Sequence, residues 1–272
     1  MGRALTPWEE VLDEAEVALE DGRHRDALQL CDRAAVMGPD GRHFAGLLRG
    51  DVLLDLGDAA GALRSYDSVA DPAVLDPEVD CARGVALFEQ ARFAEAENAL
   101  KSALRGNAEV AEAYYTLGLI AEILGTGHDI ECFRQARRLD PERFPPVPRM
   151  PRAEFEGIVE EAVRGLPDRI TKAIRGIPAL VAEVPHPADL QQADPPFSPR
   201  ILGMFVGPAP VDRSVLDAPA GEQPTILLFK RNLERACPDH DTLIYEIRQT
   251  VLHEVGHAIG LSEEELVEMG LE

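Results

Sequence analysis

The residues with the clearest chemical potential lie near the C-terminus, in the pattern His253-Glu254-x-x-His257. Residues four apart lie on the same face of an α-helix, so these two imidazoles can bind one zinc ion together. Glu254, the next residue round the helix, can take a proton from a water molecule held on that ion. Glu263 follows after a glycine and is the candidate third ligand. Two histidines and one carboxylate leave the fourth position of a tetrahedral zinc site open, as hydrolysis requires.

The stretch before these residues must then form a helix, and its pattern predicts one from about residue 241. Apolar residues recur there at spacings of three and four, with polar residues between them: Leu243, Ile244, Ile247, Val251 and Leu252. Gly260 can take the left-handed conformation that ends a helix and turns the chain back. Ser262 can then cap a new turn, with Glu265 three residues on as its capping-box partner. Glu264 is the alternative to Glu263 as the third ligand.

Composition restricts the class of protein. The chain has 272 residues, a net charge of −22 and 45% hydrophobic residues, which suits two globular domains. Its negative field repels phosphate backbones and anionic lipid surfaces, so we expect neither nucleic acid nor membranes as partners. No apolar run has the length of a membrane helix. The four cysteines are far apart and form no C-x-x-C pair, which favours reduced thiols and a cytoplasmic protein.

The first half of the chain repeats with a period near 34 residues. Gly50, Gly84 and Gly118 are 34 residues apart, and large residues occupy an equivalent later position in each unit: Cys31, Tyr66, Leu100 and Phe133. Small residues allow paired helices to approach closely, and the large ones fill the space to the next unit. The pattern resembles the tetratricopeptide repeat, a helix-turn-helix unit of 34 residues. Units are expected to begin near Trp8, His43, Pro77 and Ala111, and such solenoids bind peptides or proteins on a concave surface.

Five prolines between residues 141 and 151 predict a stiff linker at the end of the repeats. Beyond it the pattern predicts helices at 153–164 and 168–175, then strands at 179–184, 201–206 and 224–230, and finally the helix that carries the histidines. We therefore expect a repeat domain at 1–140, a linker at 141–151 and a small α+β domain at 152–272. The sheet of this last domain is expected to pack one face on the histidine helix.

This order of elements resembles the minimal zincin-like metallopeptidase domain of bacterial proteins. The resemblance extends over residues 150–272 and is clearest at 250–263, with further matches at Phe155-x-x-x-Val159, Ile201-Leu202-Gly203 and residues 229–234. The family pattern is H-E-x-x-H-x-x-G-x-x-D, and Glu263 replaces its aspartate here. The resemblance implies a zincin-like fold and a hydrolase of unassigned substrate. Zincins align the substrate along a strand at the rim of the cleft, and Thr225–Phe229 is the candidate by its order in the chain.

Two functional hypotheses follow. In the first, the protein is a zinc-dependent metallopeptidase in which Glu254 is the general base, and the repeats recruit or position a protein substrate or partner. In the second, it is a protein-interaction scaffold whose zincin module is stabilised by metal and has little or no activity. Glu254 favours the peptidase, because a purely structural zinc site needs no base and is closed by four protein ligands.

Overall fold

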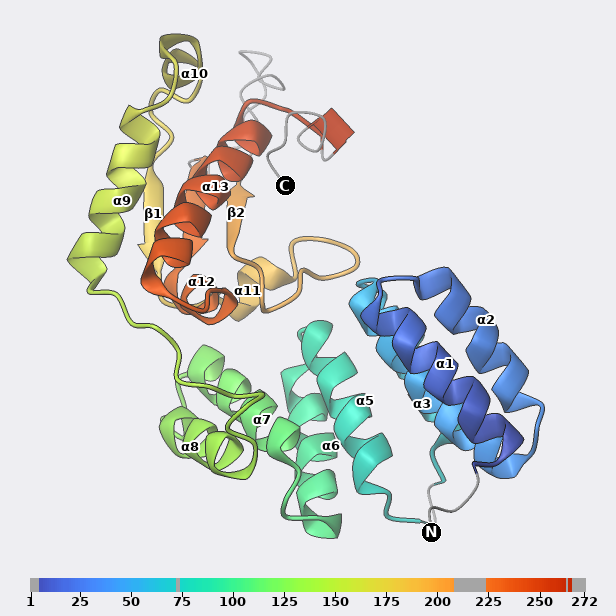
Figure 1. Cartoon of the computed structure of the whole chain (residues 1–272). Coiled ribbons are helices and arrows are strands. Elements are labelled where there is room, and N and C mark those ends of the chain that lie inside the picture. The colour runs from blue at the N-terminus through green and yellow to red at the C-terminus, as the bar shows by residue number, and fades with distance from the viewer. Residues whose placement is uncertain (1–4, 72–73, 208–223, 263, 266–272) are drawn as a thin grey trace. The chain divides into compact units, whose positions relative to one another are not determined.

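The computed structural model describes residues 5–71, 74–207, 224–262 and 264–265. The chain divides into two compact units, one of residues 1–145 with 187–199 and the other of residues 146–186 with 200–272. The first unit is helical, and the second combines helices with a short sheet (Figure 1). None of the described helices is both long enough and apolar enough to cross a membrane.

The helical unit contains four consecutive helix pairs. They are α1 (Pro7–Glu20) with α2 (His24–Ala35), α3 (Pro39–Asp55) with α4 (Ala59–Val69), α5 (Pro77–Glu89) with α6 (Phe93–Gly106), and α7 (Ala111–Leu124) with α8 (Asp129–Leu139). Three of the four expected starts agree with the structure within one residue. The second pair begins four residues before His43, because Pro39 occupies the first helical position, where its missing N–H is not needed. A short helix, α11 (Pro187–Leu190), also belongs to this unit.

Glycines on the first helix of a pair lie against large side chains of the second, as the 34-residue pattern predicts. A Cβ atom added at these glycines would lie only 2.1 to 2.7 Å from the facing side chain. The facing residues are Gly50 and Tyr66, Gly84 and Leu100, and Gly118 and Phe133. In the first pair Ala15 and Cys31 take these two positions, and both are buried in one core. Helix separation in the repeats therefore depends on small residues at one fixed position.

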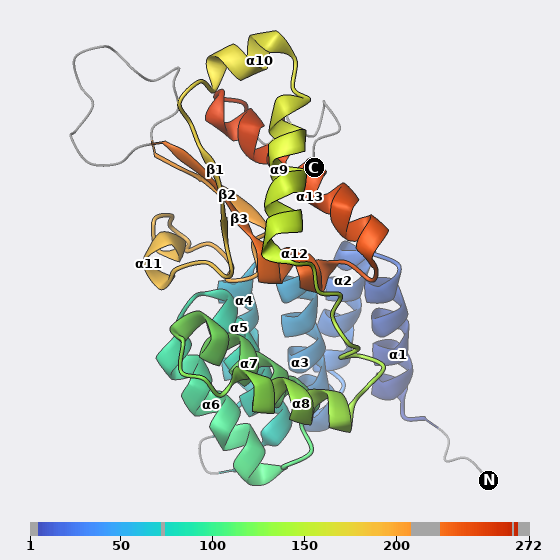
Figure 2. The same ribbon diagram turned by 90° about the vertical axis from the view of Figure 1, so that its left-hand side faces the viewer.

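The second unit packs two helices on a mixed three-stranded sheet. Its elements are α9 (Arg152–Arg164), α10 (Asp168–Ala173), β1 (Ala179–Ala182), β2 (Gly203–Val206), β3 (Thr225–Phe229), α12 (Lys230–Ala236) and α13 (His240–Ala258). The strand order is β1-β3-β2, with β1 parallel and β2 antiparallel to β3. Helices α9 and α13 pack on each other over one face of the sheet (Figure 2). The core between helices and sheet includes Phe155, Val181, Ile226, Leu228 and Val251.

The position of β3 corrects one expectation from the sequence. Thr225–Phe229 was the candidate for the strand that aligns a substrate, but it is the central strand and is hydrogen-bonded on both sides. A central strand has no free edge for an added peptide. Within the described residues, β2 pairs only with β3 and therefore forms one edge of the sheet. Order along the chain could not reveal this, because β3 inserts between two strands that precede it.

The proline-rich segment is packed at both of its ends. Phe144 is buried and stacks on Tyr115, with ring centroids 4.6 Å apart. At the other end Met150 is 3% exposed, and its backbone N–H donates to Glu234 at 3.0 Å. Between them, residues 145–148 are exposed or half-buried. We propose that the functional domain boundary lies within residues 145–148, inside the 141–151 linker expected from the sequence.

This boundary can be tested by inserting the cleavage site of a sequence-specific protease between Pro145 and Pro146. We expect an unchanged circular dichroism spectrum and complete cleavage under native conditions, giving fragments of roughly 145 and 127 residues, because exposed inter-domain segments tolerate insertion. The matched control places the same site inside α9, after Gly157, where it should disrupt the helix. Loss of folding in the first insertion would show that the boundary is misplaced.

Candidate metal site on helix α13

Helix α13 buries one apolar stripe and presents the histidines beside it. The stripe consists of Leu243, Ile247, Val251, Val255 and Ala258. At 100° per residue, Glu254 lies about 60° from the position of Val251 round the helix, and the histidines lie further in the same direction. The structure agrees with this calculation, since Glu254 is 6% exposed and His253 and His257 are half-buried. The sequence therefore places the acid between the core and the two imidazoles.

The helix ends where the sequence predicts. Gly260 has a φ of +87°, and its N–H donates to the carbonyl of His257 at 2.9 Å. The N–H of Leu261 donates to the carbonyl of Gly256 at 3.0 Å, which completes a Schellman motif. The chain turns sharply after the second histidine because a residue with this backbone conformation ends the helix.

The two histidines lie close together at their distal nitrogens. Their Nε2 atoms are 3.1 Å apart, and their rings are nearly perpendicular, at 81°. A tetrahedral zinc ion bound at its usual distance to both nitrogens requires a separation of about 3.3 Å. The separation of the two nitrogens is therefore close to the value that a shared zinc ion requires.

The third expected ligand, Glu263, lies outside the described residues. No group of three side chains able to hold a metal occurs in the part of the chain that the structure describes, which includes Glu264. The local turn follows the expected capping box. The N–H and hydroxyl of Ser262 donate to Glu265 at 2.8 and 3.1 Å, and the Glu265 N–H donates back at 3.3 Å. The Ser262 hydrogen bonds also lower the pKa of Glu265.

Gly203, the first residue of β2, provides the space in which Glu254 lies. A Cβ atom at this position would lie 2.8 Å from Cγ2 of Thr250 and 3.0 Å from both Cγ and Oε1 of Glu254. A side chain at position 203 would therefore displace Thr250 and Glu254, and glycine lets β2 pass close to α13 here. In the sequence, Gly203 belongs to the Ile201-Leu202-Gly203 match of the family resemblance, which assigns it no role. An isolated glycine inside a strand pattern is nevertheless a signal of close backbone approach.

A buried acid in α12 was also missed. Residues 230–234 are mostly polar in sequence, yet Glu234 is 0% exposed and Lys230 is 5% exposed. The Lys230 ammonium lies 2.5 Å from Oε1 of Glu234, and the guanidinium groups of Arg231 and Arg149 lie 3.0 and 3.3 Å from Oε2. Asn232, which is also buried, donates to the carbonyl of Ile201 at 2.7 Å. Helix α12 thus binds Arg149, near the start of the unit, and Ile201, just before β2. It is followed in the chain by α13, which carries the histidines.

Other candidate metal ligands of this unit have different roles. His240 pairs with Glu154 at 3.1 Å at the start of α13. Cys237 is buried, and burial raises the pKa of its thiol to about 11, so it stays protonated at neutral pH. All four cysteines are free thiols.

Family comparisons agree with this description of the two units. Residues 174–271 match the model of a family described as zincin-like metallopeptidase. Residues 12–77 and 81–127 match that of the tetratricopeptide repeat. The matches place tetratricopeptide repeats at 12–127 and a zincin-like metallopeptidase domain at 174–271, in the order that the sequence resemblance implied.

Solved structures with similarity to the chain include the crystal structure of MamA, at 21% identity over 51% of this chain and 77% of that one, with a TM-score of 0.40. A double mutant, MamA RS-1 ArsTM, has 23% identity, 51% and 79% coverage, and a TM-score of 0.41. YrrB, described as a TPR protein with an unusual peptide-binding site, has 17% identity, 50% and 70% coverage, and a TM-score of 0.39. The comparison with curated proteins found no match.

The Glu234 network predicts a large effect on the stability of the second unit. Glu234→Ala leaves the buried Lys230 unpaired and should lower the free energy of unfolding by about 3–5 kcal/mol. Because Trp8 is the only tryptophan, its fluorescence follows the repeat unit, whereas circular dichroism follows both units. The urea concentration at which the second unit unfolds should therefore fall in the dichroism signal. The unfolding midpoint of the repeat unit, followed by Trp8 fluorescence, should remain unchanged.

The matched control for this substitution is Glu161→Ala, which removes an exposed acid 4.0 Å from Arg248. Such a surface pair is worth at most about 1 kcal/mol, so little change is expected. Equal effects of the two substitutions would contradict a structural role for Glu234.

Proposed function

We propose that the C-terminal unit is a zinc-dependent metallopeptidase and that the repeat unit recruits a protein substrate or partner. The observation that carries this proposal is the pair of Nε2 atoms, 3.1 Å apart, on the helix turn that also presents Glu254. His253, His257 and Glu263 are the residues that would hold the ion. When bound, zinc lowers the pKa of a coordinated water and polarises a carbonyl group. The zincin-like family match supports the same reaction class.

Glu254 is the general base of this proposal. Its carboxylate takes a proton from the attacking water and gives it to the amine that leaves when the peptide bond breaks. Its position on the flank of the buried stripe, with Gly203 of β2 beside it, restricts its movement. A buried, immobile carboxylate is suited to proton transfer, since it does not need to reorganise during the reaction.

The edge strand β2 replaces β3 as the proposed substrate-aligning strand. It is the strand whose first residue lies against Glu254, and it packs on α13. An extended peptide that pairs with the outer edge of β2 would gain backbone hydrogen bonds there. It would run past the histidine helix at the level of the catalytic acid.

The metal-site assignment predicts one zinc ion per chain in the wild-type protein. His257→Ala removes one of two adjacent ligands and should abolish stoichiometric zinc, measured by elemental analysis after dialysis. His240→Ala is the matched control on the same helix, because His240 pairs with Glu154 instead. Glu263→Ala should weaken zinc binding and Glu264→Ala should not. Full zinc retention in His257→Ala would contradict the assignment of the metal site. Weaker zinc binding in Glu264→Ala but not in Glu263→Ala would identify Glu264 as the third ligand.

The base assignment predicts loss of hydrolysis without loss of metal. Glu254→Gln conserves size and leaves the three proposed ligands in place, so zinc content should stay at one per chain. Hydrolysis of a broad peptide library should fall by about 10²–10⁴-fold, the usual contribution of general-base catalysis. Gly203→Ala should lower the rate as well, because it displaces the Glu254 carboxylate.

An unchanged rate in Glu254→Gln would contradict the proposed role of Glu254. Absence of hydrolysis in the wild-type protein with zinc fully bound would favour the alternative hypothesis of an interaction scaffold with an inactive zincin module.

A further inference from the structure

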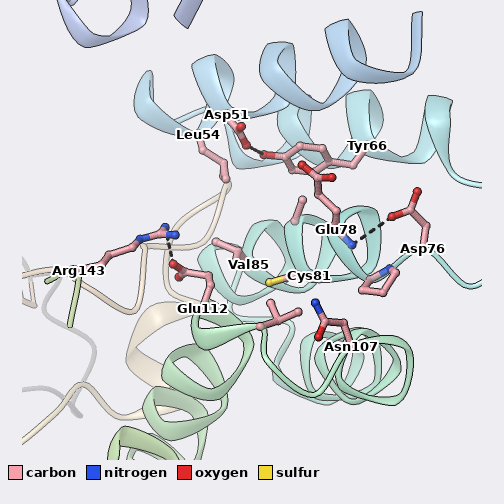
Figure 3. Close-up of a pocket in the computed structure, with 13 residues that line it drawn as sticks. Asp51, Leu54, Tyr66, Asp76, Glu78, Cys81, Val85, Asn107, Glu112 and Arg143 are labelled. Atoms are coloured by element: carbon pink, nitrogen blue, oxygen red, sulfur yellow. Dashed lines mark hydrogen bonds and ion pairs between the residues drawn. The ribbon is translucent and has the colours of Figure 1, made fainter. Parts of the chain in front are cut away.

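A cavity of about 630 Å³ lies within the repeat unit. Its walls come mainly from the first helices of three consecutive pairs, through Asp51 on α3, Glu78 on α5 and Glu112 on α7 (Figure 3). Arg143, which follows α8, closes one side. This volume is in the range of specific ligand sites. All its lining residues belong to one unit, so its shape does not depend on the zincin domain.

Asp51 is held in this cavity by a buried tyrosine. Tyr66 is 0% exposed, and its hydroxyl donates to Oδ1 of Asp51 at 2.7 Å. The tyrosine ring is fixed in turn because it lies against Gly50, where a Cβ atom would come within 2.1 Å of the ring. Burial raises the pKa of Asp51, the Tyr66 hydrogen bond lowers it, and the nearby Glu78 raises it further. The repeat core therefore fixes the position of a carboxylate that stays open to the cavity.

The cavity has more negative than positive charge. Four carboxylates line it, from Asp51, Asp76, Glu78 and Glu112, against one guanidinium, from Arg143. Arg143 pairs with Glu112 at 2.5 Å, and His43 lies 3.5 Å from Asp76. Neither Asp51 nor Glu78 forms an ion pair within the described part of the chain, and the two acids are close enough for Glu78 to raise the pKa of Asp51. Arg143 pairs with Glu112, and its charge also lowers the pKa of Asp51, but four carboxylates against one guanidinium leave excess negative charge that attracts a cation.

The remaining walls indicate which kind of cation fits. Leu54, Val85 and Val110 provide apolar surface beside the carboxylates. Such a combination suits an amphipathic side chain, with a hydrocarbon stem on the apolar wall and a charged head on the acids. Burial raises the pKa of the Cys81 thiol to about 12, so this wall residue stays neutral and does not act as a thiolate metal ligand. Arg143 already shows the chemistry that the cavity accepts, since its guanidinium binds one of the four acids.

We propose that this cavity binds an arginine or lysine side chain of a partner protein, with Asp51 and Glu78 as its counter-charges. The inference specifies the chemistry of the partner that the proposed function assigns to the repeats. Arg143 pairs with Glu112 in the same cavity and therefore competes with the incoming side chain for negative charge.

The test uses the full-length chain with Glu254→Gln, so that the probe cannot be cleaved. Two peptide libraries are incubated with the immobilised protein: one has a central arginine between five randomised residues on each side, and the other has citrulline there. Citrulline has the shape of arginine without its charge. We expect arginine peptides to be enriched, and the affinity of a selected peptide to fall about tenfold or more when citrulline replaces the arginine.

Variants locate the binding. Asp51→Asn with Glu78→Gln removes two charges while an amide oxygen can still accept the Tyr66 hydrogen bond, and it should abolish the preference for arginine over citrulline. Glu14→Gln with Glu20→Gln removes two exposed acids of α1 outside the cavity and should leave the preference unchanged. Arg143→Gln frees Glu112 and should strengthen binding. Circular dichroism verifies that each variant is folded.

Several results would overturn the proposal. These are equal enrichment of the arginine and citrulline libraries, a preference for arginine that persists in Asp51→Asn with Glu78→Gln, or selection of acidic peptides that is lost in Arg143→Gln. Because the assay needs neither zinc nor turnover, its failure leaves the peptidase proposal intact, and failure of the peptidase proposal leaves this binding site intact.

Discussion

The burial of one face of α13 is the constraint on which the candidate metal site depends. The apolar stripe that ends at Ala258 fixes the rotation of the helix against the sheet and α9. Once that rotation is set, the 100° step per residue determines where His253, Glu254 and His257 point. The acid lies at the edge of the core, and the imidazoles lie beyond it. The chemistry of the site is thus a consequence of packing that involves none of the reactive residues.

In both units a neighbouring element packs closely against a glycine, with a different consequence in each. In the repeats, Gly50 accommodates the ring of Tyr66 and sets the distance between paired helices. In the zincin-like unit, Gly203 allows the edge strand to pass the helix beside Glu254, the proposed general base. Each glycine contact also fixes a carboxylate, since Tyr66 holds Asp51 and Gly203 bounds Glu254. The same structural device serves a proposed binding site in one unit and a proposed reaction centre in the other.

The two proposed sites are chemically complementary. The proposed cavity site carries excess negative charge for a cationic side chain, and β2 pairs on one side only among the described strands, which is where the proposed peptide would bind. The first gives preference for one side chain, whereas backbone hydrogen bonds along a strand give mainly affinity. A peptidase with a weakly selective cleft gains specificity when another domain of the chain binds the substrate.

The sequence by itself determined the local features: four helix pairs of period 34, the helix that ends at Gly260, the turn capped by Ser262 and Glu265, and the order of the strands and of helices α9, α10 and α13 in the second unit, although not helix α12. These follow from interactions between residues a few positions apart, so a linear pattern contains them. Only the tertiary structure decided that β3 is the central strand, that Glu234 is buried among Lys230, Arg231 and Arg149, and that Asp51, Glu78 and Arg143 share one cavity. Strand order and the pairing of buried charges depend on contacts between distant segments, for which hydropathy and spacing provide no local signal.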